Sequence, residues 1–155
     1  MIKSHSLKRI GVVAGTLSAA VLLTITQASA VSAETERATA ATGPDTVDSW
    51  ECAHTGPSDD HTGTTCYSDL GDWLEITDGA ADGSSAVMDW EIRDAQNRVV
   101  RFGATFNADG SGAVRYKNKD FPEANTTIRF RARLGHWSTK SITAGTCSAW
   151  MTRGT

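Results

Sequence analysis

Hydrophobic and polar residues alternate with a period of two along several short stretches of the chain after Trp50. In the clearest stretch, 127–134, four apolar positions alternate with three arginines: Ile128, Phe130, Ala132 and Leu134, with Arg129, Arg131 and Arg133 between them. Weaker alternation covers 72–77, 87–93, 100–106, 114–117 and 148–152. This period predicts β-strands with one buried and one wet face. The residues expected to face the core elsewhere are Met88, Trp90, Ile92, Phe102, Ala104, Phe106 and Trp150.

Short Asp-Gly pairs separate these stretches, at Asp78-Gly79, Asp82-Gly83 and Asp109-Gly110. Such pairs are typical of the turns that join two strands of a hairpin. No stretch shows the spacing of three and four residues between apolar positions that an amphipathic helix requires. The fold is therefore predicted to be all-β, a small antiparallel β-sandwich of Ig-like or barrel-like form.

The first 33 residues have a different pattern from the rest of the chain. Basic residues near the start are followed by the uncharged, apolar stretch 10–25, and then by small residues at Ala28-Ser29-Ala30 and Val31-Ser32-Ala33. This order predicts a signal peptide over 1–33, cleaved after Ala30 or Ala33, and a secreted, extracellular protein. The apolar stretch is shorter than the roughly 20 residues of a membrane-spanning helix, so no span is expected after signal removal.

Residues 34–49 contain a single large apolar residue, Val47. A segment of this composition buries too little surface to offset its ordering entropy, so 34–49 is predicted to be a flexible N-terminal lead. The β-sandwich domain is then expected to cover 50–155.

Charge is unevenly distributed along the chain, whose net charge is −3. Removal of the signal peptide takes away three basic residues and no acidic one, so the mature protein is more acidic still. Net negative charge argues against nucleic acid as a partner, because such binding needs excess Lys and Arg. Acidic residues are concentrated before position 95 and basic residues after it, which favours pairing of Asp89 and Glu91 with the arginines of 129–133 across neighbouring strands.

Several short motifs in this region also occur together in one group of proteins. The first runs from Asp72-x-Leu74-x-Ile76-x-Asp78 to Ala81-Asp82-Gly83-x-Ser85-Ala86-Val87-x-x-Trp90, and the later ones include Arg129-Phe130-Arg131, Ser138-Thr139-Lys140-Ser141-Ile142 and Cys147-Ser148-x-Trp150. In these motifs the chain resembles small secreted proteins of Streptomyces and related actinobacteria. The resemblance implies a secreted β-sandwich without an assigned activity or assigned site residues.

Three cysteines follow the signal peptide: Cys52, Cys66 and Cys147. In an exported protein an odd number indicates one disulfide and one remaining thiol. Cys52–Cys66 would close a short polar loop, and Cys66–Cys147 is the alternative, which would join the first strand region to the last. His54 and His61 lie near the first two cysteines and would complete a zinc ligand set, although an oxidising compartment favours the disulfide.

No other cofactor is expected from the sequence, with one weak exception. Asp78 with Asp82, or Asn107 with Asp109, place oxygen ligands on glycine turns, as calcium prefers. Neither turn completes an EF-hand loop, and Asp-Gly turns are more often plain hairpins.

The sequence contains no motif of nucleophilic or zinc-dependent catalysis, such as G-x-S-x-G or H-E-x-x-H. We therefore predict a non-catalytic protein that acts through its surface, on a cell-envelope polymer, a polysaccharide or another extracellular protein. The candidate binding residues are Trp50, His136 and Trp137, which can stack on a ligand, and Arg129, Arg131 and Arg133, which can bind a polyanion. The alternative function is that of a small extracellular enzyme or enzyme inhibitor.

Overall fold

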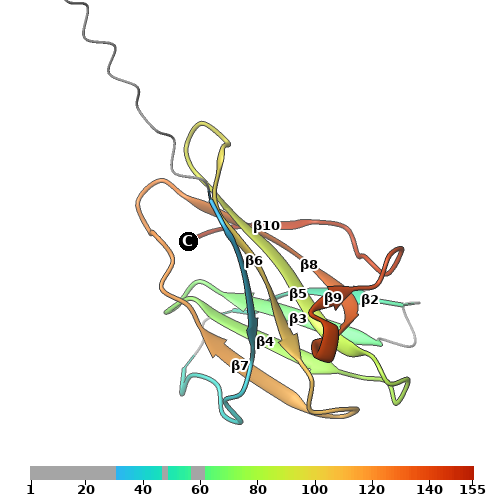
Figure 1. Ribbon diagram of the computed structural model, residues 1–155. Helices are drawn as coiled ribbons and strands as arrows, with labels where there is room; N and C mark the ends of the chain where they lie inside the picture. Colours follow the sequence, from blue (N-terminus) through green and yellow to red (C-terminus); the bar gives the residue numbers. More distant parts are fainter. Residues whose placement is uncertain (1–30, 47–48, 57–61) are drawn as a thin grey trace, which may run out of the picture.

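The computed structural model describes residues 31–46, 49–56 and 62–155 (Figure 1). The elements in chain order are β1 (Ala33–Arg37), β2 (Glu51–Thr55), β3 (Gly63–Ser68), β4 (Trp73–Asp78), β5 (Ser85–Arg93), β6 (Val99–Asn107), β7 (Val114–Asn118), β8 (Thr127–His136), the 3-10 helix η1 (Trp137–Thr139), β9 (Ser141–Ile142) and β10 (Met151–Gly154). Most of the predicted signal peptide, 1–30, lies outside the described residues. Within them, no helix has the length and apolar character needed to cross a membrane.

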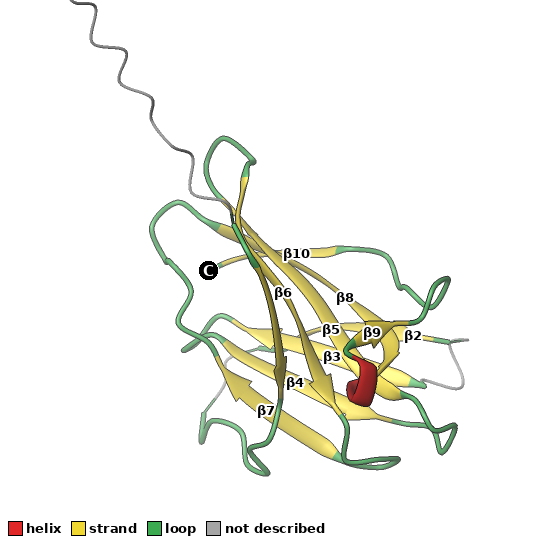
Figure 2. Cartoon of the chain, in the orientation of Figure 1, coloured by secondary structure: helices red, strands yellow, loops and turns green. Residues whose placement is uncertain are grey.

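The strands form two sheets that pack against each other (Figure 2), as the predicted all-β sandwich requires. Sheet A has the order β1-β6-β5-β8-β10, with β9 paired to β8. Sheet B has the order β2-β3-β4-β7. Neighbouring strands are antiparallel in the described pairs, except that β1 runs parallel to β6.

The core lies between the two sheets, and β5 and β8 contribute to it as predicted. Met88, Trp90 and Ile92 of β5 are buried there, and so are the alternating apolar residues of β8 up to Ala132. From sheet B come Tyr67, Leu74 and Ile76. Period-two alternation predicted these faces correctly because each strand has large apolar side chains on one side only.

The prediction that Phe102, Ala104 and Phe106 of β6 face the core between the sheets is wrong. Phe102 lies directly opposite Glu91 of β5, and Ala104 lies opposite Asp89. Residues directly opposite each other on neighbouring strands share a face, so Phe102 and Ala104 lie on the outer face of sheet A with these carboxylates. Phe106 lies on the same outer face and is fully buried there, because the ring of Trp137 packs on it with centroids 5.6 Å apart.

The other face of β6 is polar, yet it is the one that faces sheet B. Thr105 is fully buried, and its hydroxyl accepts a hydrogen bond from Nε1 of Trp90 at 3.1 Å. The guanidinium of Arg101 lies 5.7 Å from the Trp90 ring centroid. The core therefore has a polar end next to β1, and the sequence pattern of β6 does not reveal it.

The prediction of a flexible lead is also wrong for its first part, because Ala33–Arg37 form β1 alongside β6 (Figure 1) and Ala40 pairs with Tyr116; 47–48 lie outside the described residues. The Glu34 carboxylate pairs with Arg101, and also with Lys119 at 2.8 Å. Glu36 pairs with Lys119 as well, and the Lys119 side chain is only 3% exposed. β1 contributes little apolar surface, and its carboxylates neutralise cations that would otherwise be buried without partners.

The segment after β1 crosses to sheet B and covers part of its outer face. Ala40 and Tyr116 of β7 exchange backbone hydrogen bonds at 2.9 and 3.3 Å. Gly43 lies on the ring of Tyr116, where an added Cβ would come within 2.6 Å of a ring carbon. The ring of Trp50 lies 6.4 Å from the same ring. The N-terminal residues thus close one edge of the sandwich and shield sheet B.

Candidate functional site

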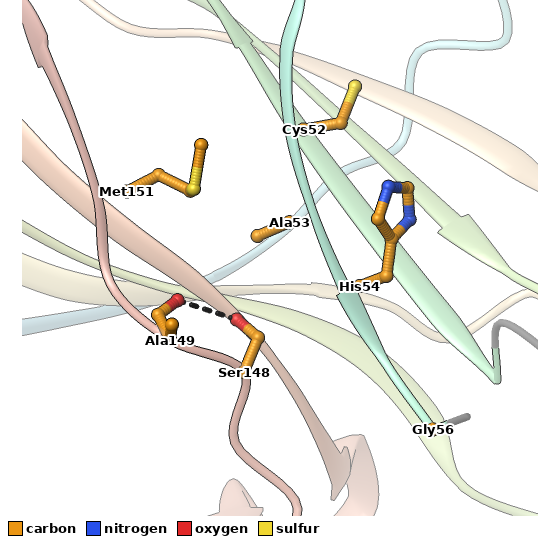
Figure 3. Close-up of a pocket in the computed structure, with 7 residues that line it drawn as sticks. All are labelled: Cys52, Ala53, His54, Gly56, Ser148, Ala149 and Met151. Atoms are coloured by element: carbon orange, nitrogen blue, oxygen red, sulfur yellow. Dashed lines mark hydrogen bonds between the residues drawn. The ribbon is translucent and has the colours of Figure 1, made fainter. Parts of the chain in front are cut away.

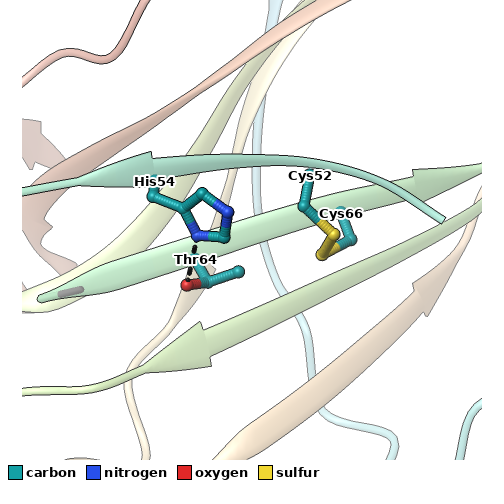
Figure 4. The surroundings of a disulfide bond; sticks show 4 residues. All are labelled: Cys52, His54, Thr64 and Cys66. Carbon is teal, nitrogen blue, oxygen red and sulfur yellow. Dashed lines mark hydrogen bonds between the residues drawn. A yellow bond between two sulfur atoms is a disulfide. The ribbon is translucent and has the colours of Figure 1, made fainter. Parts of the chain in front are cut away.

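Cys52 and Cys66 form the disulfide, with Cα atoms 4.1 Å apart, on directly opposite positions of β2 and β3 (Figure 4). The preferred pairing is confirmed, and the alternative Cys66–Cys147 is wrong, since Cys147 is free and exposed. Thiols that are bonded to each other do not ligate zinc, and His61 of the predicted zinc ligand set lies outside the described residues. His54 shares a hydrogen bond of 2.9 Å with the hydroxyl of Thr64.

One of the two calcium candidates is engaged in contacts within the protein. The side chain of Asn107 is fully buried; its amide nitrogen donates to the carbonyl of Ala113 at 2.8 Å, and its Oδ1 accepts from the Asp109 amide at 3.2 Å. The carboxylate of Asp109 pairs with Arg37 and Arg115, and the hydrogen bond from Arg115 lowers the pKa of this carboxyl. These oxygens are already neutralised or bonded.

The other candidate pair differs in its burial. Asp78 is 1% exposed and accepts a hydrogen bond of 3.4 Å from the Ala80 amide, whereas Asp82 is exposed and accepts one from the Ser84 amide. Burial raises the pKa of the Asp78 carboxyl. Across 31–46, 49–56 and 62–155, no three His, Cys, Asp or Glu residues are grouped so that they could hold a metal. Calcium binding stays a prediction.

The structure separates the predicted binding residues into two groups. Trp50 packs on Tyr116 beside sheet B. His136 is the exposed last residue of β8, and Trp137 opens η1 beside sheet A. Of these three aromatic residues, His136 and Trp137 therefore belong to the same sheet side as the arginines of β8, with Trp137 packed on Phe106 of β6.

The outer face of sheet A carries three columns of side chains in register. The β6 column is Phe102, Ala104 and Phe106; the β5 column is Glu91, Asp89 and Val87; the β8 column is Arg129, Arg131 and Arg133. An apolar column thus lies beside an acidic one, and the acidic column lies beside a basic one.

The predicted pairing of the arginines with β5 is confirmed. Asp89 pairs with Arg131 at 2.7 Å and with Arg133 at 3.4 Å. Glu91 pairs with Arg129 at 3.3 Å and also with a fourth guanidinium, that of Arg93, at 2.8 Å. Each carboxylate is therefore shared by two guanidiniums, which leaves the face with a surplus of positive charge.

Trp150 lies on this face, although the alternation in 148–152 predicts that it faces the core. Its ring centroid is 4.2 Å from the guanidinium carbon of Arg131 and 4.9 Å from that of Arg129. An indole over two guanidiniums holds both side chains extended through cation–π contact. The arginine column is therefore fixed on both sides, by carboxylates and by the indole.

A hollow of about 200 Å³ lies over the apolar column of the same face. Its lining residues come from β1, β5, β6 and the η1–β9 segment: Ala33, Glu34, Thr35, Asp89, Phe102, Gly103, Ala104, Lys140 and Ile142. Lys140 has a left-handed backbone, with φ of 54°, and its ammonium lies over the Trp137 ring. Desolvation lowers the pKa of Lys140, and so does the charge of Arg37. Among the described ion pairs, none neutralises Lys140.

Asp89 presents one carboxylate oxygen that the arginines do not use. Both hydrogen bonds from Arg131 and the one from Arg133 reach Oδ2. No described side chain donates to Oδ1 of this residue, and Asp89 lines the hollow. The hollow thus combines an apolar floor, a hydrogen-bond acceptor and a cation.

A second groove of about 420 Å³ lies between β2 and the segment before β10 (Figure 3). It is lined by Cys52, Ala53, His54, Gly56, Ser148, Ala149 and Met151. The hydroxyl of Ser148 donates to the Ala149 carbonyl at 2.8 Å and accepts from the Ala132 amide at 3.0 Å. His54 bonds to Thr64 on the neighbouring strand. The serine and the histidine are therefore not paired with each other, as a nucleophile and its base would be.

Comparisons with protein-family models, with curated proteins and with solved structures find no match for the chain.

None of the residues that line the hollow was among the binding residues predicted from the sequence, and its chemistry depends most on Phe102, Ala104 and Lys140. The first two were assigned to the core because their alternation resembles that of a buried face. The opposed charges of β5 and β8 indicate which side of β5 faces out, but the side of β6 follows only from its register with β5. No sequence signal marks Lys140, whose place depends on the turn through η1.

Proposed function

We propose that this is a secreted, non-catalytic binding protein that attaches through the outer face of sheet A to an anionic polymer of the cell envelope. The observation that carries the proposal is the charge arrangement of this face: Asp89 and Glu91 are shared by four guanidiniums, and Lys140 adds an unneutralised ammonium. Guanidiniums held in a row bind phosphate or carboxylate groups without rearrangement.

Two further observations support export and a binding role. The n-region, apolar stretch and small residues of 1–33 are typical of a signal peptide, and the Cys52–Cys66 disulfide fits an oxidising compartment. The enzyme alternative has less support, because Ser148 and His54 in the larger groove bond to other groups. The resemblance to secreted actinobacterial proteins stays a prediction.

The test is co-sedimentation of the mature protein with purified Gram-positive cell walls that carry teichoic acid. We expect binding at low salt that weakens as salt rises, because the contacts are electrostatic. Arg129→Gln should weaken binding by about 1 kcal/mol, or roughly fivefold.

The matched control is Arg98→Gln, which removes the same charge from an arginine that is 73% exposed in the β5–β6 turn, away from the three columns. Its binding should equal that of the unchanged protein. Absence of wall binding at low salt, or equal losses for both variants, would overturn the proposal.

A further inference from the structure

The hollow on the outer face of sheet A differs from the arginine column beside it in shape and in chemistry. We infer that it is a subsite for one sugar ring that carries one acidic group, with the ring on the floor of Phe102 and Ala104 and the acidic group on Lys140. This inference rests on the proposed function, since it names the repeating unit that the polymer would present at that face.

The size of the hollow limits its occupant. Its volume of about 200 Å³ is below the roughly 300–1,000 Å³ of pockets for drug-sized ligands, so it has room for one ring. Ala104 sets this volume, because it is the one small side chain of the β6 column, between Phe102 and Phe106. A larger residue at 104 would fill the hollow from its floor.

The floor suits the apolar side of a sugar ring. Phe102 is half-buried and Ile142, from β9, lines the same hollow. Carbon-bound hydrogens of a sugar pack against such apolar and aromatic surface, while the hydroxyls at the ring edge need polar partners.

The walls supply those polar partners. Oδ1 of Asp89 is the acceptor for a ring hydroxyl, because Arg131 and Arg133 bond only to Oδ2. These two guanidiniums also outweigh the charge of the carboxylate, so Asp89 does not repel an anionic ligand.

Lys140 makes the site selective for charge. Its ammonium lies over the Trp137 ring, and the described ion pairs provide it with no carboxylate. A carboxylate or phosphate on the sugar would neutralise it, and a neutral sugar would leave it unpaired. An acidic sugar is therefore favoured over a neutral one.

The experiment is a titration of the isotope-labelled mature protein, followed by amide chemical shifts, with three probes. These are glucuronic acid, glucose 1-phosphate and neutral glucose. We expect both acids to shift the amides of Phe102, Ala104 and Lys140, and to bind at least tenfold more tightly than glucose. The tighter of the two acids identifies the acidic group as carboxylate or phosphate.

Two variants locate the subsite. Ala104→Leu should abolish the shifts from both acids, while its matched control Ala95→Leu, in the exposed β5–β6 turn, should bind as the unchanged protein does. Lys140→Gln, at an exposed position, should lower acid affinity to that of glucose, and it keeps the test valid if Ala104→Leu fails to fold.

The outcomes separate this inference from the proposed function. Acids that leave the three amides unshifted, in a protein that still sediments with walls, would overturn the subsite alone. Equal affinity for glucose and the two acids would overturn the role of Lys140. A protein that binds neither walls nor acids would overturn both.

Discussion

The outer faces of the two sheets are built differently. On sheet B, the Cys52–Cys66 disulfide crosslinks β2 and β3, and Tyr116 of β7 is covered by Gly43 and Trp50. On sheet A, the side chains of the charged columns are 15–30% exposed, the hollow lies beside them, and the Trp150 ring lies over two of the arginines.

The same N-terminal segment produces this difference. β1 extends sheet A at its edge, and the chain then crosses over at Ala40 to cover sheet B. A face covered by its own chain serves stability, whereas a face left open with oriented charges can serve binding. Substitutions on sheet B should therefore affect stability and spare binding, and substitutions on sheet A should do the reverse.

The largest expected effect is on sheet B, from replacing Cys52 and Cys66 together by Ser. Loss of the crosslink should destabilise the protein by about 3 kcal/mol, as expected for a closed loop of about 15 residues. Chemical denaturation measures the loss, and wall binding should be unchanged while the protein is folded. In the unfolded, unreduced protein a thiol reagent should label Cys147 alone; label on Cys52 would refute the pairing.

A smaller effect is expected where the N-terminal segment covers sheet B. Gly43→Ala places a Cβ about where the Tyr116 ring lies, so the segment must shift, at a cost of about 2 kcal/mol. Gly154→Ala is the control, because nothing lies within 4 Å of its added Cβ. Equal melting temperatures for the two variants would show that the packing of the N-terminal segment on sheet B does not stabilise the protein.

On sheet A, Arg131→Gln should cost less stability than either change on sheet B, about 1 kcal/mol, because the side chain is partly exposed and Arg133 still pairs with Asp89. The same change should weaken wall binding. A stability loss as large as that from the disulfide would mean that the arginine column is a structural element, and the contrast between the faces would fail.

The last effect depends on pH and concerns β1, the strand that pairs with β6. The hydrogen bond from Arg101 lowers the pKa of Glu34 from 4.5 to about 2. The folded state therefore gains stability above pH 4.5, and loses it as pH falls from 4.5 towards 2. Only the first part of this loss occurs above pH 4.

Melting temperatures of the unchanged protein and of Glu34→Gln, measured from pH 7 to pH 3, test this assignment. The unchanged protein should lose its advantage over the variant as the pH approaches 3. A constant difference between the two across this range would contradict the role of Glu34 in holding β1.

The sequence predicted the elements whose signals are local. Alternation in 127–134 placed Ile128 and Phe130 in the core, and the opposed charges of β5 and β8 predicted the pairs of Asp89 and Glu91. The short polar loop between Cys52 and Cys66 favoured the observed disulfide. In each case the deciding residues are near in sequence, or lie on strands that have only one apolar side.

Other features are ambiguous in the sequence for physical reasons. In β6, Phe102 and Ala104 alternate with Arg101 and Thr105, and this pattern does not state which side is buried. A shift of one position exchanges the faces of a strand, so the pairing with β5 decides. The prediction of a flexible lead failed because it considered only how much apolar surface the segment can bury. The ion pairs of β1 join Glu34 to Arg101 and Lys119, which lie far along the chain.

By itself, then, the sequence determined the fold class and the inner faces of β5 and β8, and it favoured the observed disulfide, because periodicity, turn residues and loop length act over a few positions. The tertiary structure decided which side of β6 faces out, that β1 joins the sheet, and that Lys140 lies over the hollow beside Asp89. These three features depend on contacts between residues distant in sequence. Such contacts form, and contribute free energy, only when the sheets pack together.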